Sequence, residues 1–210
     1  MANKAKILLV VAATLAIAGC AGKFRSDVSS WHRLQQPSGE TFAVMAKNPA
    51  KQGGLEFAQY SGLVAEQLRQ IGYRQTAPGA QPDLIVRVDY SIGDPRTEIR
   101  SYNNGSFYGH YGNHFNRGFY GHPHYGHGYG NGGSDIRSYP LFSRRLEMEI
   151  AAANNPGVNL FESRVISEGR SNRLEEVMPL MVESMFQDFP GPSGVTREVT
   201  IDLEEATSSY

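Results

Sequence analysis

The sequence offers almost no sulfur chemistry, because its only cysteine is Cys20. A single cysteine excludes an intramolecular disulfide, a thiol redox pair and a cysteine-rich metal site. A strong charge of either sign is also missing, since the formal net charge is −1 over 210 residues. This balance argues against a nucleic-acid interface and against a polybasic membrane patch.

The amino-terminal apolar run is too short for a permanent membrane span. Residues 1–6 carry two lysines, and residues 7–18 have no charge. A transmembrane helix needs about 20 such residues, so the run is typical of a signal peptide. The sequence Ile17-Ala18-Gly19-Cys20 then follows. It resembles the bacterial lipobox, in which an aliphatic residue and two small residues precede the cysteine that accepts the lipid.

The lipobox resemblance implies a lipid-anchored mature chain. Residues 1–19 would be removed, with Ile17, Ala18 and Gly19 recognised by the signal peptidase, and Cys20 would carry the lipid. A diacylglyceryl thioether, usually with a further palmitate-type acyl chain on the amine, is enough for stable anchoring. No aspartate follows Cys20, which favours the outer membrane on its periplasmic side. The alternative is a plain secretory signal with a chance cysteine.

Recognisable catalytic motifs are absent as well. The chain has no G-x-S-x-G elbow, no H-E-x-x-H zinc motif and no phosphate-binding loop. We therefore expect a protein that is not an enzyme and that has no cofactor besides its lipid. An enzyme of unrecognised type remains an alternative.

Periodicity predicts the elements of the mature chain. Apolar residues at helical spacing, Phe57, Tyr60, Val64, Leu68 and Ile71, predict an amphipathic helix that ends at a glycine. A second helix is expected over residues 174–189, with Asn172 and Glu175 as a capping box and Pro179 possible as the first residue of its main part. Alternation predicts strands at residues 41–46, 84–92, 142–150, 158–167 and 195–203.

The order of these elements predicts one α+β domain. We expect a mostly antiparallel sheet of four to five strands with two helices on one face. The domain is assigned to residues 41–205, after a lipidated tether at residues 20–40. Residues 23–31 alternate weakly and fit either a first strand or part of the tether.

Residues 101–134 contain no aliphatic residue and are dominated by glycine, tyrosine, histidine, asparagine and phenylalanine. This composition predicts a disordered, low-complexity insertion. Histidine is a common ligand of Zn²⁺, Cu²⁺ and Ni²⁺, so weak metal binding or buffering is an alternative function. Contact with glycan or cell wall is another. The candidate ligands are His110, His114, His122, His124 and His127.

Several short segments together resemble a family of bacterial lipoproteins, domain-of-unknown-function family 4136. Besides the lipobox, they are Thr41-Phe42-Ala43, Ile71-Gly72-Tyr73, Pro82-Asp83-Leu84 and Phe189-Pro190. The resemblance implies a domain with a variable middle loop, and because the family has no agreed biochemical function, it does not indicate an activity. The strand after Pro192 lies outside the resemblance.

The leading hypothesis is therefore a lipid-anchored envelope lipoprotein that acts as a non-enzymatic interaction or assembly module. Its expected partners are the membrane, through the lipid, and an envelope protein or the cell wall. Nucleic acid is not an expected partner, and the sequence does not indicate an oligomeric state.

Overall fold

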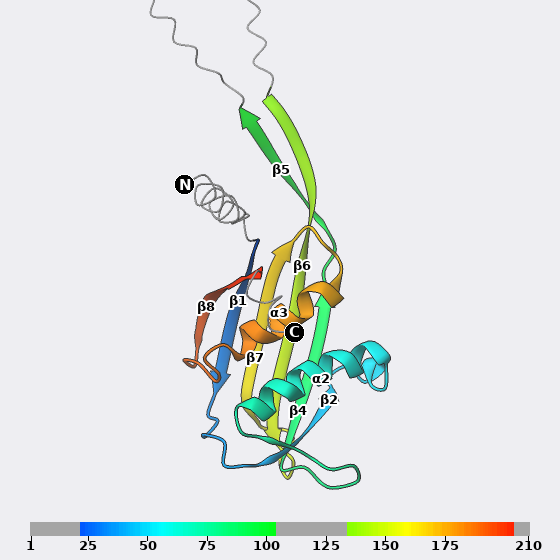
Figure 1. Ribbon diagram of the computed structural model, residues 1–210, viewed down its shortest axis with the longest axis vertical. Helices are drawn as coiled ribbons and strands as arrows, with labels where there is room; N and C mark the ends of the chain where they lie inside the picture. Colours follow the sequence, from blue (N-terminus) through cyan, green and yellow to red (C-terminus); the bar gives the residue numbers. More distant parts are fainter. Residues whose placement is uncertain (1–21, 104–133, 204–210) are drawn as a thin grey trace, which may run out of the picture.

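The computed structural model describes residues 22–103 and 134–203. The signal peptide, Cys20 and all five histidines proposed as metal ligands lie outside this described part. Figure 1 shows one sheet with two α-helices across it. The elements are β1 (Lys23–His32), β2 (Thr41–Ala46), a short 3-10 helix (Pro49–Lys51), α2 (Leu55–Gln70), β3 (Arg74–Gln75), β4 (Leu84–Ile92), β5 (Arg96–Asn103), β6 (Ser134–Ala152), β7 (Asn159–Gly169), α3 (Leu174–Phe186) and β8 (Val195–Asp202).

The sheet is larger than the sequence analysis predicted, and it is mixed. It has eight strands, in the order β3-β2-β4-β6-β7-β1-β8, with β5 paired to β6 only. The prediction of a mostly antiparallel sheet of four to five strands was therefore wrong, although the α+β class and the two helices hold. Three strands had been missed or left open. β3 is only two residues long, β5 lies in a segment without clear alternation, and residues 23–32 form β1 inside the sheet.

The parallel pairs arise from the connection between β2 and β4. Phe42 pairs with Leu84 and Ala46 with Val88 in a parallel register, and α2 lies in the chain between these strands. A strand that is followed by a covering helix returns to the same end of the sheet, so the next strand runs parallel to the first. The prediction of a mostly antiparallel sheet included the helix between these two strands but not their parallel pairing.

The first helix agrees with the prediction and ends in a Schellman motif. Its buried residues include Phe57, Tyr60 and Val64. At its end, Tyr73 N donates to Leu68 O at 3.1 Å and Gly72 N donates to Arg69 O at 3.1 Å. Gly72 has φ +109°, a conformation that favours glycine. The stop signal in the sequence was therefore correct.

The second helix begins at Leu174 and runs through Pro179 without a break. Its N-cap is Arg173, which forms no side-chain cap hydrogen bond, so the predicted capping box is wrong. Instead, Ser171 Oγ accepts from Arg173 N at 3.1 Å just before the helix. Pro179 lies inside the helix, where it has no N–H to donate to the carbonyl four residues earlier.

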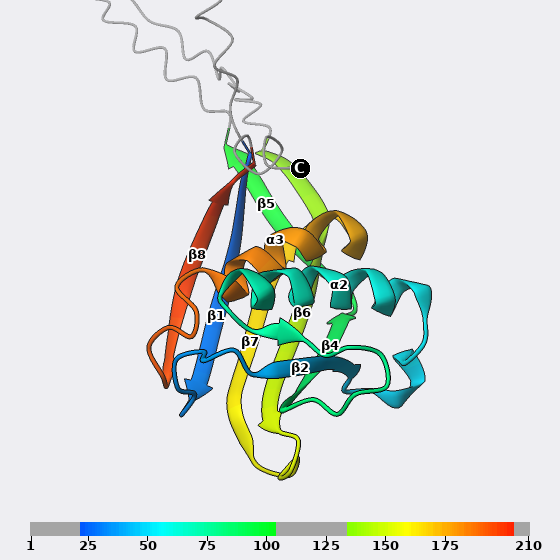
Figure 2. The ribbon, with the colours of Figure 1, turned by 60° about the horizontal axis from the view of Figure 1, so that its bottom comes forward.

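The core lies between the helices and one face of the sheet. Figure 2 shows α2 and α3 side by side over this face. Fully buried side chains come from both layers, including Val64, Met181, Leu146 and Phe161. Burying each such side chain contributes about 1.5–3 kcal/mol, so this layer supplies most of the stabilisation. The opposite face of the sheet carries neither α2 nor α3.

A two-stranded ribbon extends beyond the sheet. Asn103 pairs with Ser134, and the antiparallel register continues to Arg96 and Leu141 at the base. In Figure 1 this ribbon, formed by β5 and the first part of β6, leaves the body of the domain. Arg96 forms an ion pair with Glu168 of β7 at 2.6 Å, which ties the ribbon base to the sheet. No helix within the described residues is long and apolar enough to cross a membrane.

Candidate functional site on the open face of the sheet

Charged side chains cover the face of the sheet that points away from α2 and α3. Successive residues of a strand point to opposite faces. In β4, β6 and β7 the buried positions face the helices, so the residues between them face outward. We call this surface the open face. Its central residues are Arg87, Asp89, Arg145, Glu147, Glu149, Glu162 and Arg164.

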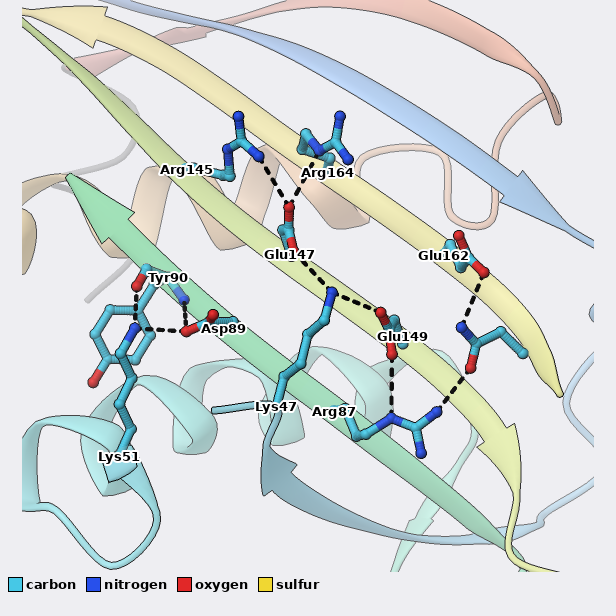
Figure 3. Close-up of polar contacts among 11 residues, drawn as sticks. Lys47, Lys51, Arg87, Asp89, Tyr90, Arg145, Glu147, Glu149, Glu162 and Arg164 are labelled. Carbon is cyan, nitrogen blue, oxygen red and sulfur yellow. Dashed lines mark hydrogen bonds and ion pairs between the residues drawn. The ribbon is translucent and has the colours of Figure 1, made fainter. Parts of the chain in front are cut away.

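Glu147 is the centre of an ion-pair network on the open face (Figure 3). Its carboxylate contacts Lys47 Nζ at 2.9 Å, Arg145 Nη1 at 3.3 Å and Arg164 Nε at 3.3 Å. These three cations come from the chain after β2, from β6 itself and from β7. The side chain of Glu147 is 19% exposed although no helix covers it, because the longer basic side chains surround it.

The network continues along β6 toward the β6–β7 turn. Glu149 contacts Lys47 Nζ at 2.7 Å and Arg87 Nε at 3.2 Å. Arg87 Nη2 donates to Asn159 Oδ1 at 2.8 Å, and Asn159 Nδ2 donates to Glu162 Oε1 at 2.9 Å. Charges on three strands are thus held in fixed positions by one another.

This pairing keeps the two central carboxylates ionised. Partial burial acts to raise the pKa of Glu147 and of Glu149, but hydrogen bonds from Lys47 and its arginine neighbours outweigh it, and both pKa values lie below the ordinary value. The same hydrogen bonds raise the pKa of Lys47. The network therefore keeps its charges at neutral pH.

Exposed apolar side chains stand at both ends of one cross-strand row of the open face. The register aligns Met45, Arg87, Glu149, Glu162 and Trp31 across five strands. Trp31, the only tryptophan of the chain, is 47% exposed, and Met45 is 45% exposed. A half-exposed tryptophan at the edge of an ordered charged surface is a typical binding hot spot.

A second set of interacting polar side chains lies beside the network. Lys51 Nζ contacts Asp89 Oδ1 at 2.5 Å and sits 4.1 Å from the centroid of the Tyr90 ring. A shallow cavity of about 200 Å³ is lined by Asp89, Tyr90, Ser91, Arg145 and Glu147. Its walls are almost entirely polar, so it suits a side chain or loop of a partner better than an apolar ligand.

The described residues contain no candidate metal site. They include no group of three or more histidine, cysteine, aspartate or glutamate side chains that could hold a metal ion. Burial raises the pKa values of Tyr60, Tyr73 and Tyr90 to about 12, so these phenols stay protonated at neutral pH. The proposed metal ligands and the lipidation site lie outside the described residues, so those predictions are not tested here.

The family-resemblance residues meet at one end of the sheet. Asp83 Oδ2 accepts from Thr41 N at 2.8 Å and from Thr41 Oγ1 at 2.7 Å. These hydrogen bonds lower the pKa of Asp83, and they hold the start of β4 to the start of β2. Two of the motif segments are therefore joined by hydrogen bonds that stabilise this end of the sheet.

The other motif segments line a groove at the same end. It has a volume of about 370 Å³. Ile71 and Tyr73 come from the end of α2, and Phe189 and Pro190 come from the chain after α3. The remaining lining residues are Leu34, Gln35, Gln36 and Pro37. The groove thus joins segments that are far apart in the sequence.

The fold and the open face define a small α+β protein with one mixed sheet, helices on one side and a paired-charge surface on the other. Residues 25–191 match the family described as domain of unknown function DUF4136. The chain therefore belongs to this family, as the resemblance predicted. β8 lies beyond the matched region. Among curated proteins, none matches this chain.

Solved structures of distant proteins show partial likeness. One is a PDZ domain protein from Parabacteroides distasonis, with 14% identity and a TM-score of 0.47, which covers 92% of this chain and 42% of that one. The chain thus spans less than half of that protein. Another is the PelC dodecamer from Paraburkholderia phytofirmans, with 13% identity and a TM-score of 0.37, which covers 75% of this chain and 91% of that one.

Proposed function

We propose that this protein is a lipid-anchored protein of the bacterial envelope, on the periplasmic side of the outer membrane, and that it binds another envelope protein without catalysing a reaction. The open face is its binding surface. The observation that supports this most is the row from Met45 to Trp31, in which ordered charges are flanked by exposed apolar side chains.

The chemistry of the open face favours a protein partner. Basic and acidic side chains occur on it in nearly equal numbers and pair with one another, as the contacts of Glu147 and Glu149 show. A polyanion or an anionic membrane would be attracted to one sign and repelled by the other. A protein surface of mixed charge with an apolar pocket for Trp31 matches both features.

The ion pairs also lower the cost of binding. Long side chains such as Lys47, Arg87 and Arg164 lose rotamer freedom when an interface forms. Here they are already held by Glu147, Glu149 and Asn159. A preorganised surface loses less entropy on association, which is what a binding module requires.

Substitution of Trp31 tests the proposal. The full-length chain, purified in detergent, is used as bait for envelope extracts, and the captured partner is quantified by mass spectrometry. We expect Trp31→Ala to reduce capture by about tenfold or more, since hot-spot truncation costs about 2 kcal/mol. The matched control is Leu55→Ala, because Leu55 is 91% exposed at the start of α2, away from the open face.

Charge reversal provides the second arm. Glu162→Lys on the open face should weaken capture of the same partner, whereas Glu66→Lys on α2 should not. Each glutamate is exposed and pairs with its own neighbours, Glu162 with Asn159 and Glu66 with Arg69. Equal capture by Trp31→Ala and Leu55→Ala, together with equal capture by the two lysine variants, would contradict the proposal.

A further inference from the structure

Three buried polar side chains that face the helices each have an atom without a hydrogen-bond partner. Arg144 pairs with Ser167. Ser26 and Ser167 lie one residue beyond the last pair of the β1–β7 register, Asp27 and Ile166, and both line one pocket at that point. The three residues are 4%, 2% and 4% exposed, respectively. Arg144 Nε, Ser167 Oγ and Ser26 Oγ are all buried without a hydrogen-bond partner. Buried polar groups nearly always have a hydrogen-bond partner, so three neighbouring residues with unpaired buried atoms need an explanation.

A second serine pair on the same face serves as an internal comparison. Ser30 and Ser163 are also cross-strand partners, and they also face the helices. Their hydroxyls bond to each other at 3.3 Å. Ser26 and Ser167 lie just beyond the end of the same register, and their hydroxyls have no hydrogen-bond partner. Ser167 is also the cross-strand partner of Arg144.

The guanidinium of Arg144 is fixed by close packing on a glycine. A Cβ atom added to Gly169 would lie 2.5 Å from Nη2 and 3.1 Å from Cζ of Arg144. The side chain therefore fills the space that a side chain at position 169 would occupy. The guanidinium thus lies over Gly169, near the end of β7.

No negative charge in the described part of the chain compensates this guanidinium. Burial lowers the pKa of Arg144, and no carboxylate acts in the opposite direction. The arginines of the open face behave differently, since Arg87, Arg145 and Arg164 each meet a glutamate. A buried cation without a counter-charge is unfavourable, and a planar guanidinium fork matches the oxygens of a carboxylate or a phosphate.

We propose that Arg144, Ser167 and Ser26 form an anion-binding site, in which the guanidinium and the two hydroxyls donate hydrogen bonds to one carboxylate or phosphate group. The site is separate from the open face, because these residues point to the opposite side of the sheet. Anion binding at this site can therefore be tested independently of the proposed protein-binding function.

The test measures anion binding by the full-length chain in detergent. Inorganic phosphate and acetate are titrated separately against chloride at equal ionic strength, and both the thermal midpoint and the Nε–Hε NMR signal of Arg144 are followed. We expect a saturable rise of the midpoint, about 3 °C at ten times the Kd, together with a shift of the Arg144 signal. The anion with the lower Kd identifies the group that the site prefers.

Three variants separate this site from general salt effects. Arg144→Met removes the charge, and Gly169→Ala keeps the charge but displaces the guanidinium. Both should abolish the saturable rise. The double variant S26A/S167A should weaken binding by about tenfold or more, whereas S30A/S163A, which removes the bonded serine pair, should leave the Kd unchanged.

The outcomes decide the proposal. Wild-type protein without a saturable response to either anion overturns it. An unchanged Kd in S26A/S167A overturns it as well, and this variant carries the test if the Arg144 and Gly169 variants fail to fold. Loss of binding in S26A/S167A with retention in S30A/S163A supports it.

Discussion

Glu147 shows how a single carboxylate organises the surface of this protein. It lies on a face without helices, yet it is mostly buried by the three basic side chains that contact it. A partly buried charge is costly when it is unpaired and favourable when several cations surround it. Removing Glu147 would therefore affect three partners at once.

The network predicts an acid-sensitive contribution to stability. The folded-state pKa values of Glu147 and Glu149 are lowered below 4.5. A group with a depressed folded pKa stabilises the protein above its unfolded pKa, and this stabilisation is lost as the pH falls through the folded pKa. Urea unfolding should therefore show a free energy of unfolding that is constant near neutral pH and decreases below about pH 4.5.

Glu147→Gln should lower the free energy of unfolding at pH 7 by about 1–2 kcal/mol. It should also flatten the decrease of stability below pH 4.5, because one depressed carboxylate is gone. The matched control is Glu66→Gln in the exposed pair with Arg69, for which a change within about 0.5 kcal/mol is expected. Equal effects of the two substitutions would mean that the network adds no stability.

At the scale of elements, the end of α2 depends on one glycine. Gly72 has φ +109°, a conformation that costs other residues about 1–2 kcal/mol. Gly72→Ala should lower the free energy of unfolding by that amount, measured by urea denaturation. Gly62→Ala, inside the same helix and with open space around its Cβ, should instead be neutral or raise it by up to about 1 kcal/mol. The same sign for both variants would contradict this account of the helix end.

Strongly periodic elements could be predicted from the sequence. The apolar stripe of α2 and the alternation of β4, β6 and β7 each repeat over many residues, and the structure confirms these elements. β3 and β5 could not be predicted. β3 has two residues, and β5 is exposed, with Ile99 69% exposed, so neither leaves an apolar pattern.

Only part of the candidate site could be predicted from the sequence. Alternation showed that Arg87, Glu147 and Glu149 face away from the core, but not that they meet one another. Their contacts depend on the register between β4, β6 and β7 and on the parallel position of β2, which brings Lys47 to Glu147. The position of Arg144 beside Ser167 likewise depends on strand register, although the alternation of Leu146, Met148 and Ile150 already places Arg144 on the core side of β6.

For the whole molecule, the ribbon offers a precise way to test the metal hypothesis. Asn103 and Ser134 are paired, so residues 104–133 can be replaced by a two-residue Asn-Gly turn. If the histidines from His110 to His127 bind metal, titration calorimetry with Zn²⁺, Cu²⁺ or Ni²⁺ should show binding to the full chain and none to the shortened one. Equal affinity of both chains, or none tighter than about millimolar, would remove the hypothesis.

The lipid anchor is a second property of the whole chain. If Cys20 accepts the lipid, the variant Cys20→Ser should lose incorporation of labelled palmitate and should leave the membrane fraction. The chain has no other cysteine, so no other thiol can take its place. Palmitate labelling that persists in Cys20→Ser would show that the lipobox resemblance is misleading.

The most direct test of the central claim is site-specific photo-crosslinking in intact cells. A photo-reactive amino acid replaces Arg164, which is exposed on the open face, or Gln59, which is exposed on α2. The proposed function predicts a covalent adduct with one envelope protein from position 164 and none from position 59. That adduct should weaken when Trp31→Ala is added. An adduct from position 59 alone, or from neither position, would contradict the assignment of the open face as the binding surface.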